Sequence, residues 1–83
     1  MIVRYDPEAD LVAIEFRELQ TGRWAGERID ERRYVLREKD TGEVLGVELL
    51  FVSKGIDLAG LPEEARLREA LREAHAAMGA AVA

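Results

Sequence analysis

The sequence predicts an α+β domain in which a four-stranded antiparallel β-meander precedes one C-terminal α-helix packed on one face of the sheet. Up to residue 53, short apolar or alternating runs are separated by turn-forming residues, which is typical of strands. After Pro62 the apolar residues recur every three or four positions, which is typical of an amphipathic helix. A chain of 83 residues has room for one hydrophobic core. We therefore expect a single domain over 1–83, divided into a β-meander core at 1–53, a connector at 54–61, a helix at 62–79 and a frayed tail at 80–83.

The first two strands are predicted by apolar runs on either side of a turn. Residues 2–5 form the first run, and residues 11–17, apolar at nearly every position, form the second. Between them, Asp6 and Pro7 occupy the two positions at which a type I turn favours these residue types. The beginning of the chain therefore predicts a β-hairpin.

The middle of the chain predicts a loop and then a third strand. Residues 20–26 contain two glycines and Trp24, and we expect a loop there. Residues 29–38 are expected to form the third strand because the end of this segment alternates strongly. Tyr34 and Leu36 share one face in this pattern, and the other face carries Arg33, Val35 and Arg37.

The fourth strand is the most apolar segment of the chain. It is predicted over 44–52, after a hairpin turn at 39–43 in which Gly42 is free to adopt a positive φ. The sheet face that we expect to be buried carries Val3, Tyr5, Val12, Ile14, Phe16, Tyr34, Leu36, Leu45, Val47, Leu49 and Phe51. The opposite face is expected to carry Arg4, Glu15, Arg33, Arg37 and Glu48.

The helix is expected to begin at Pro62 and to end at Gly79. Proline suits the first helical position, because an N–H there has no partner within the helix. Glu63 and Glu64 complement the positive end of the helix dipole, and Gly79 is a natural stop. The stripe expected to cover the sheet consists of Leu67, Leu71, Ala74 and Met78.

Composition favours a cytoplasmic protein that does not bind a polyanion. The formal net charge is −5, and 35% of the residues are charged with both signs mixed along the chain. Cysteine is absent, which excludes disulfides, thiolate zinc sites and thiol nucleophiles and is compatible with a reducing compartment. The chain begins without the apolar run of a signal peptide, and no run approaches the roughly 18 apolar residues of a membrane span.

The acidic cluster Asp6-x-Glu8-x-Asp10 resembles the start of a calcium-binding loop. Such a loop also needs glycine at its sixth position and glutamate at its twelfth, which are Leu11 and Arg17 here. We therefore interpret the cluster as a turn, and we expect neither a metal nor a cofactor.

Two further groups are weak candidates for catalysis. His75 is the only histidine, and its place beside the apolar stripe indicates a residue at the border of the helix. Ser53 and Lys54 are adjacent, so on an extended strand they would point to opposite faces and would not meet. We expect no catalytic residue and no enzymatic activity.

A cluster of arginines between residues 28 and 37 suggests an alternative function. Trp24 and Tyr34 lie close in sequence to the arginines, and such a mixture can bind nucleic acid through phosphate contacts and stacking. Acidic residues are interleaved with the arginines and nearly cancel their charge, so a solvated strand face is the preferred interpretation. The candidate contacts of this alternative, a regulator that touches nucleic acid, are Arg28, Arg32, Arg33 and Arg37.

Three segments are similar to a small prokaryotic family catalogued as domain of unknown function 2283. They are Tyr5-Asp6-x-x-x-Asp10, the apolar strand that follows it, and Gly46-Val47-Glu48-Leu49 followed by Ser53. The resemblance covers about residues 1–53. It implies a compact β-meander and a protein partner encoded by a neighbouring gene, in an antitoxin-like role, and it implies no reaction or cofactor. The Arg-rich third strand departs from relatives that are more acidic there.

The fourth strand also predicts self-association. In a simple meander this strand is an edge, yet it is apolar on both faces, and one helix covers only one of them. Either the strand lies inside the sheet or another subunit covers it. We expect a homodimer, and the candidate interface residues are Trp24, Val44, Leu50 and Val52. The function that the sequence favours is a non-enzymatic protein-interaction module.

Overall fold

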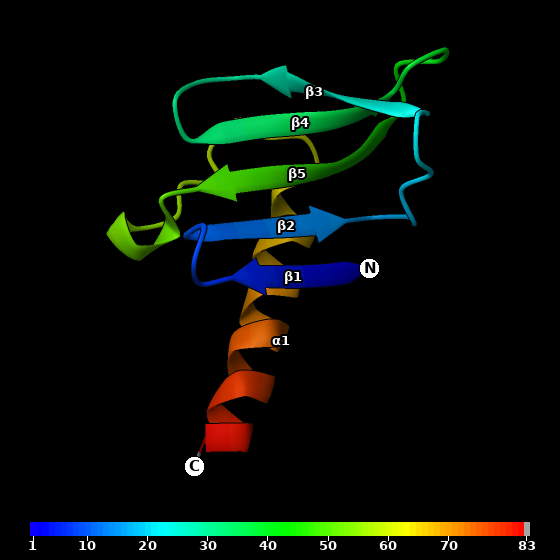
Figure 1. Ribbon diagram of the computed structural model, residues 1–83. Helices are drawn as coiled ribbons and strands as arrows, with labels where there is room; N and C mark the ends of the chain where they lie inside the picture. The colour runs from blue at the N-terminus through cyan, green and yellow to red at the C-terminus, as the bar shows by residue number, and fades with distance from the viewer. Residues whose placement is uncertain (83) are drawn as a thin grey trace.

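The protein is an α+β fold in which one helix packs on an antiparallel sheet. The computed structural model describes the backbone of residues 1–82 and the side chains of residues 1–76. The sheet has five strands in the order β1-β2-β5-β4-β3, and Figure 1 shows the helix crossing behind it. The elements are β1 (Ile2–Asp6), β2 (Leu11–Glu15), β3 (Trp24–Arg28), β4 (Arg33–Glu38), β5 (Val44–Leu50), the 3-10 turn η1 (Val52–Lys54) and α1 (Glu64–Val82).

The prediction of four strands is wrong because the segment expected to be a loop contains β3. Trp24–Arg28 pairs with Arg33–Glu38 as an antiparallel hairpin. The predicted third strand therefore begins only at Arg33, since residues 29–32 form the hairpin turn. Within this turn the Asp30 carboxylate accepts a hydrogen bond from the Arg32 amide at 2.9 Å.

The strand order is not that of a simple meander. β5 lies between β2 and β4, so β1 and β3 are the two edges. Ile14 of β2 and Val35 of β4 both pair with Val47 of β5. The central position explains why β5 is apolar on both faces, and it confirms one of the two outcomes that the sequence left open.

The predicted division of residues between the two faces is partly wrong. Val35 belongs to the cluster beneath α1, so Arg33 and Arg37, two positions away on either side, face the helix as well. The register of β4 against β5 shifts between Leu36 and Arg37. Tyr34 and Leu36 were expected beneath the helix and lie on the opposite face, whereas Leu45, at the register shift, is buried outside the cluster beneath the helix.

Two aromatic residues predicted to be buried are exposed for different reasons. Tyr5 pairs with the buried Val12, but it lies on the edge strand and remains 52% exposed. Phe51 follows the end of β5, where a φ of 54° turns the chain into η1. Its side chain is 48% exposed.

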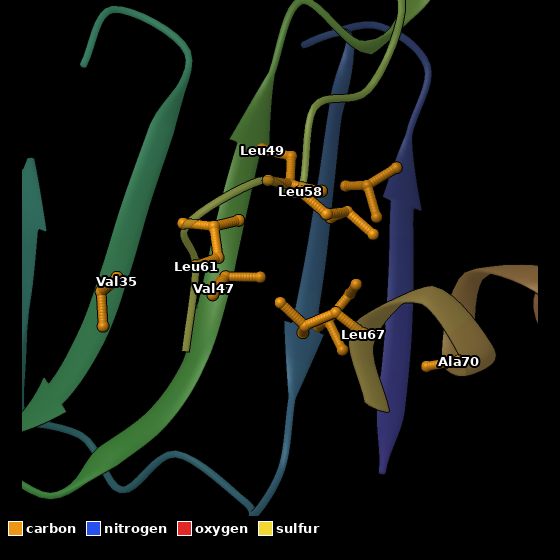
Figure 2. Packing of buried hydrophobic residues seen from close by; sticks show 9 residues of the cluster. Val35, Val47, Leu49, Leu58, Leu61, Leu67 and Ala70 are labelled. Atoms are coloured by element: carbon orange, nitrogen blue, oxygen red, sulfur yellow. The ribbon is translucent and has the colours of Figure 1, made fainter. Parts of the chain in front are cut away.

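The core lies between α1, the sheet and the connector (Figure 2). Leu58 and Leu61 of the connector are buried in it, although the sequence assigned them no role in the core. Arg33 holds this connector to the sheet by donating a hydrogen bond to the Ala59 carbonyl at 2.5 Å. The buried cluster is Val12, Ile14, Val35, Val47, Leu49, Leu58, Leu61, Leu67 and Ala70.

The helix begins later and ends later than expected. α1 starts at Glu64 rather than Pro62. At its other end it continues through Gly79 to Val82, because the alanines on either side of Gly79 favour helix strongly. The predicted tail at 80–83 is thus helical as far as Val82, and its last residue lies outside the described residues. The Met78 side chain is also outside the described part.

α1 runs across the strands and extends past β1 (Figure 1). Within residues 1–82, no helix combines the length and the apolar composition needed to cross a membrane.

Candidate interaction surface

The sheet face opposite α1 is not covered by a second layer within the described residues (Figure 1). We call it the open face. The strand registers arrange its side chains in rows across the sheet, and Leu11 opposite Leu50 forms one apolar row. Apart from the glycines, its residues are Ile2, Arg4, Asp6, Leu11, Ala13, Glu15, Trp24, Arg28, Tyr34, Leu36, Glu38, Glu48 and Leu50.

The open face carries buried and half-buried apolar side chains. Leu36 and Ala13 are buried there, and Leu11, Tyr34 and Leu50 are half-buried. A Cβ atom built on Gly26 would lie 3.5 Å from a ring carbon of Tyr34, so this ring lies over the glycine of the edge strand. The open face thus carries half-buried apolar side chains, with Glu48 directly opposite Tyr34.

A buried carboxylate on the open face is neutralised from the neighbouring strand. Arg4 Nε lies 2.9 Å from Glu15 Oε2. The Glu15 side chain is only 7% exposed, whereas the Arg4 side chain is 64% exposed. Because a buried carboxylate needs a partner, this ion pair stabilises Glu15 in its buried position on the open face.

The four candidate interface residues do not form one surface. Trp24 and Leu50 are both on the open face, but they belong to opposite ends of the strands. Val44 and Val52 pack against the core cluster on the helix side. Of the four, only Trp24 and Leu50 therefore lie on the open face.

The four candidate nucleic-acid contacts are divided between the two sides of the sheet. Arg28 is on the open face, and Arg32 lies in the hairpin turn. Arg33 is bonded to Asp30 at 2.8 Å and to the Ala59 carbonyl. Arg37 lies 3.4 Å from Glu27 and donates to the Gly42 carbonyl at 2.9 Å. Two of the four arginines thus stabilise the fold on the helix side.

A cleft of about 570 Å³ opens at the end of the sheet where β4 begins. Arg32 and Lys54 line it together with Asp30, Glu31 and Asp57. Hydrogen bonds from the Arg32 amide and then from the Arg33 side chain hold the pKa of Asp30 below its ordinary value of 3.8. Asp30 is therefore ionised and already bonded, which makes it a poor general base or acid.

Asp10 and Ser53 meet although 43 positions separate them. Asp10 Oδ1 accepts from the Ser53 amide at 2.8 Å, and Asp10 Oδ2 accepts from the Ser53 hydroxyl at 2.6 Å. This contact ties the first hairpin to η1. The resemblance to a known family rested partly on these two residues, and the structure gives them a structural role.

In the acidic cluster at the first turn, Asp6 stabilises the turn by accepting hydrogen bonds from backbone amides. Asp6 accepts hydrogen bonds from the amides of Glu8 and Ala9 at 3.1 and 3.2 Å. No group of three metal-binding side chains gathers within the described residues. His75 lies on an exposed part of α1.

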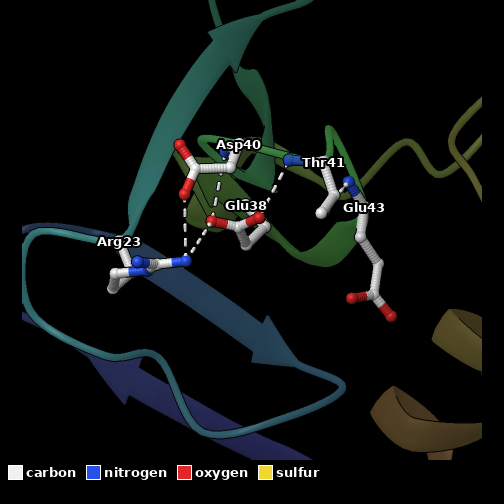
Figure 3. Close-up of polar contacts among 5 residues, drawn as sticks. All are labelled: Arg23, Glu38, Asp40, Thr41 and Glu43. Atoms are coloured by element: carbon white, nitrogen blue, oxygen red, sulfur yellow. Dashed lines mark hydrogen bonds and ion pairs between the residues drawn. The ribbon is translucent and has the colours of Figure 1, made fainter.

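A polar cluster that the sequence did not predict fixes the turn between β4 and β5 (Figure 3). The Glu38 carboxylate accepts from the amides of Asp40 and Thr41 at 3.1 and 2.9 Å, and these bonds hold its pKa below the ordinary value of 4.5. Arg23 lies 3.2 Å from Glu38 and 3.1 Å from Asp40. Because Arg23 directly precedes β3, the cluster also anchors the start of that edge strand.

No family model matches the chain, and neither a curated protein nor a solved structure matches it.

Proposed function

We propose that the protein is a non-enzymatic protein-interaction module whose partner-binding surface is the open face. The observation that carries this proposal is the half-buried apolar group of Leu11, Tyr34 and Leu50 on a sheet face without a covering layer in the described residues. A partner that covers this group would remove apolar surface from water, which is the main driving force of association.

The charge of the molecule supports a basic protein as the partner. The net charge is −5, which favours encounter with a positively charged surface. Glu48 contributes a carboxylate in the same row as Tyr34. A nucleic-acid partner fits less well, because the arginines are divided between two faces and two of them are already bonded.

The biological setting is part of the proposal. The resemblance over residues 1–53 suggests an antitoxin-like role beside a small protein from a neighbouring gene. A cytoplasmic location is compatible with a chain that contains no cysteine.

The proposal is tested with one substitution on the open face and a matched one elsewhere. Leu50→Arg places a charge in the apolar row, whereas Ile29→Arg makes the same kind of change at an exposed residue of the β3–β4 turn. Partners are captured from the source cells with each tagged variant, and the captured protein is then purified and titrated. We expect Leu50→Arg to weaken binding at least about tenfold and Ile29→Arg to leave it unchanged.

Equal binding by both variants would contradict the use of the open face. The antitoxin-like role has its own test, which is coexpression with the adjacent small gene. Relief of toxicity together with a stable complex is the expected result, and unrelieved toxicity would remove that role. Fluorescence anisotropy with labelled DNA and RNA tests the alternative function, in which the partner is a nucleic acid. We expect no saturable binding in this assay.

A further inference from the structure

Within the part of the chain that the structure describes, β1 is an edge strand, and part of its backbone has no strand to pair with. The Phe16 amide donates to the Leu45 carbonyl, and the Asp10 carbonyl accepts from the Val52 amide. Both bonds point from the ends of β2 toward β5. Since backbone groups alternate in direction along a strand, the odd-numbered residues of β2 bond to β1 instead.

This alternation identifies the free groups of the edge. Ile2, Arg4 and Asp6 pair with the odd-numbered residues of β2, so their amides and carbonyls face inward. Val3 and Tyr5 therefore direct their N–H and C=O groups outward. Such an edge is a template for another strand.

A groove lies between this edge and the helix. It has a volume of about 440 Å³, and Met1, Val3, Ala70 and Ala74 are among its lining residues. α1 continues beyond β1 (Figure 1). The stretch from Ala74 to Val82 is about 12 Å long at about 1.5 Å per residue, which spans two more strands spaced about 4.8 Å apart.

The exposed side chains of the β1 edge are unusually apolar. Met1, Ile2 and Tyr5 are 51%, 41% and 52% exposed. The other edge, β3, has fewer apolar residues and carries Glu27 and Arg28, which protect an edge from pairing. β1 also carries two charges, but Arg4 is paired with Glu15 and Asp6 accepts hydrogen bonds from its own turn. The two edges are thus not equivalent, and β1 is the one suited to pairing.

We propose that β1 pairs antiparallel with β1 of a second copy of this chain, so that two five-stranded sheets form one continuous sheet. A two-fold axis perpendicular to the sheet keeps both helices on the same side. The overhanging part of each α1 then covers the partner's β1. The pairing uses the backbone edge and the helix-side row of β1 and leaves Leu11, Tyr34 and Leu50 uncovered, so this inference is independent of the proposed function.

The sequence of β1 selects one register for this pairing. An axis at Arg4 would place that arginine opposite the partner's Arg4, and like charges directly opposite are unfavourable. An axis at Tyr5 would place Val3 opposite the partner's Pro7, which has no amide to donate. An axis at Val3 avoids both problems and aligns residues 1–5 of the two chains.

In the Val3-centred register, apolar side chains meet on the helix side. Val3 lies opposite the partner's Val3, and Met1 lies opposite the partner's Tyr5. From Ala76 onward the sequence of α1 contains no charged residue. The self-complementarity of the edge and the uncharged overhang above it are the reasons for choosing a second copy as the occupant.

The first test is the mass in solution and the protection of two amides. Light scattering after size exclusion at micromolar concentration should give twice the 9.3 kDa chain mass. Hydrogen exchange of the full chain should show the Val3 and Tyr5 amides protected, with protection lost on dilution. A monomer at this concentration, or a dimer with both amides exchanging freely, would overturn the proposal.

The second test introduces one proline into each edge strand. Tyr5→Pro removes an outward amide of β1, whereas Arg28→Pro removes an outward amide of β3. We expect Tyr5→Pro to raise the dimer dissociation constant at least about tenfold and Arg28→Pro to leave it unchanged. Tyr5→Lys, which keeps the amide and adds a charge to the helix-side row, should weaken the dimer as well. Dimers of unchanged strength in both Tyr5 variants would contradict the pairing.

Discussion

At the scale of single residues, the absence of a side chain at Gly46 allows β2 and β5 to lie side by side. A Cβ atom at this position would overlap the carbonyl oxygen of Ile14 in the backbone of β2. Gly46 pairs with Glu15 at this point and lies beside the register shift of β4. Backbone atoms cannot move aside as a flexible side chain can, so the strands would have to separate.

We therefore expect Gly46→Ala to destabilise the protein by about 1–3 kcal/mol. Gly26→Ala is the matched control, because its added methyl group would make an ordinary contact with the Tyr34 ring. Urea unfolding of the two variants measures the difference. Equal stability of both variants would show that β2 and β5 are not held this closely.

The pKa of Glu38 predicts how stability depends on pH. Its folded value lies below 4.5 because the Asp40 and Thr41 amides bond to the carboxylate. A group of this kind contributes its full stabilisation above the unfolded pKa and loses it as the pH falls through the folded pKa. Glu38→Gln should therefore reduce the loss of stability as the pH falls below about 4.5, as measured by thermal unfolding over a pH series. An unchanged pH profile in this variant would contradict the role of these hydrogen bonds.

At the scale of elements, the helix stabilises the sheet through its first two turns. Leu67 is fully buried and Ala70 is buried beside it, whereas Leu71 is only half-buried. The predicted stripe includes Leu67 and Leu71, which do pack on the core, but it missed the buried Ala70, and the pattern could not rank its members. That ranking depends on where α1 crosses the sheet.

Leu67→Ala should cost about 2–5 kcal/mol, because it leaves a cavity in the centre of the core. Leu71→Ala should cost clearly less, since water already reaches this side chain. Chemical denaturation of both variants gives the comparison. A larger effect at Leu71 would place the centre of the helix–sheet contact nearer the end of the helix.

The strands differ in how well the sequence predicted them. β2 and β5 were predicted because nearly every residue of these two segments is apolar. β3 was missed because Trp-Ala-Gly-Glu-Arg neither alternates nor is apolar, and its extended form depends on bonds to β4 and on Arg23. The alternation of β4 was clear, but alternation alone does not tell which of its faces meets the helix.

The candidate site was only partly predictable for a similar reason. Trp24 and Leu50 were singled out and do lie on the open face. Val44 and Val52 were assigned to the same surface by counting alternate positions, and this count fails at the bulge beside Gly46 and at the turn after β5. Irregularities of this kind leave little trace in the residue pattern.

At the scale of the whole molecule, the sheet does not have a complete core of its own. The buried faces of β2 and β5 are covered by Leu58, Leu61 and the beginning of α1. The segment predicted as the β-meander core, residues 1–53, contains none of this cover. The connector and helix are therefore required parts of the folding unit.

A chain truncated after Gly60 should lack a cooperative unfolding transition, because it exposes the apolar face of the sheet to water. A chain truncated after Ala76 keeps Leu67, Ala70 and Leu71 and should unfold cooperatively. Circular dichroism during heating distinguishes the two. A cooperative transition in the shorter chain would show that the strands are self-sufficient.

The central position of β5 also has a consequence for how the chain folds. Tyr5 pairs with Val12 across a short turn, and β3, β4 and β5 are joined in the same local way. Among the strand pairs of the described sheet, only the seam between β2 and β5 brings together distant parts of the sequence, such as Ile14 and Val47. Closing that long loop costs chain entropy before any contact across the seam is gained. The two locally formed parts of the sheet are therefore expected to arise first, and their joining along this seam is expected to set the folding rate.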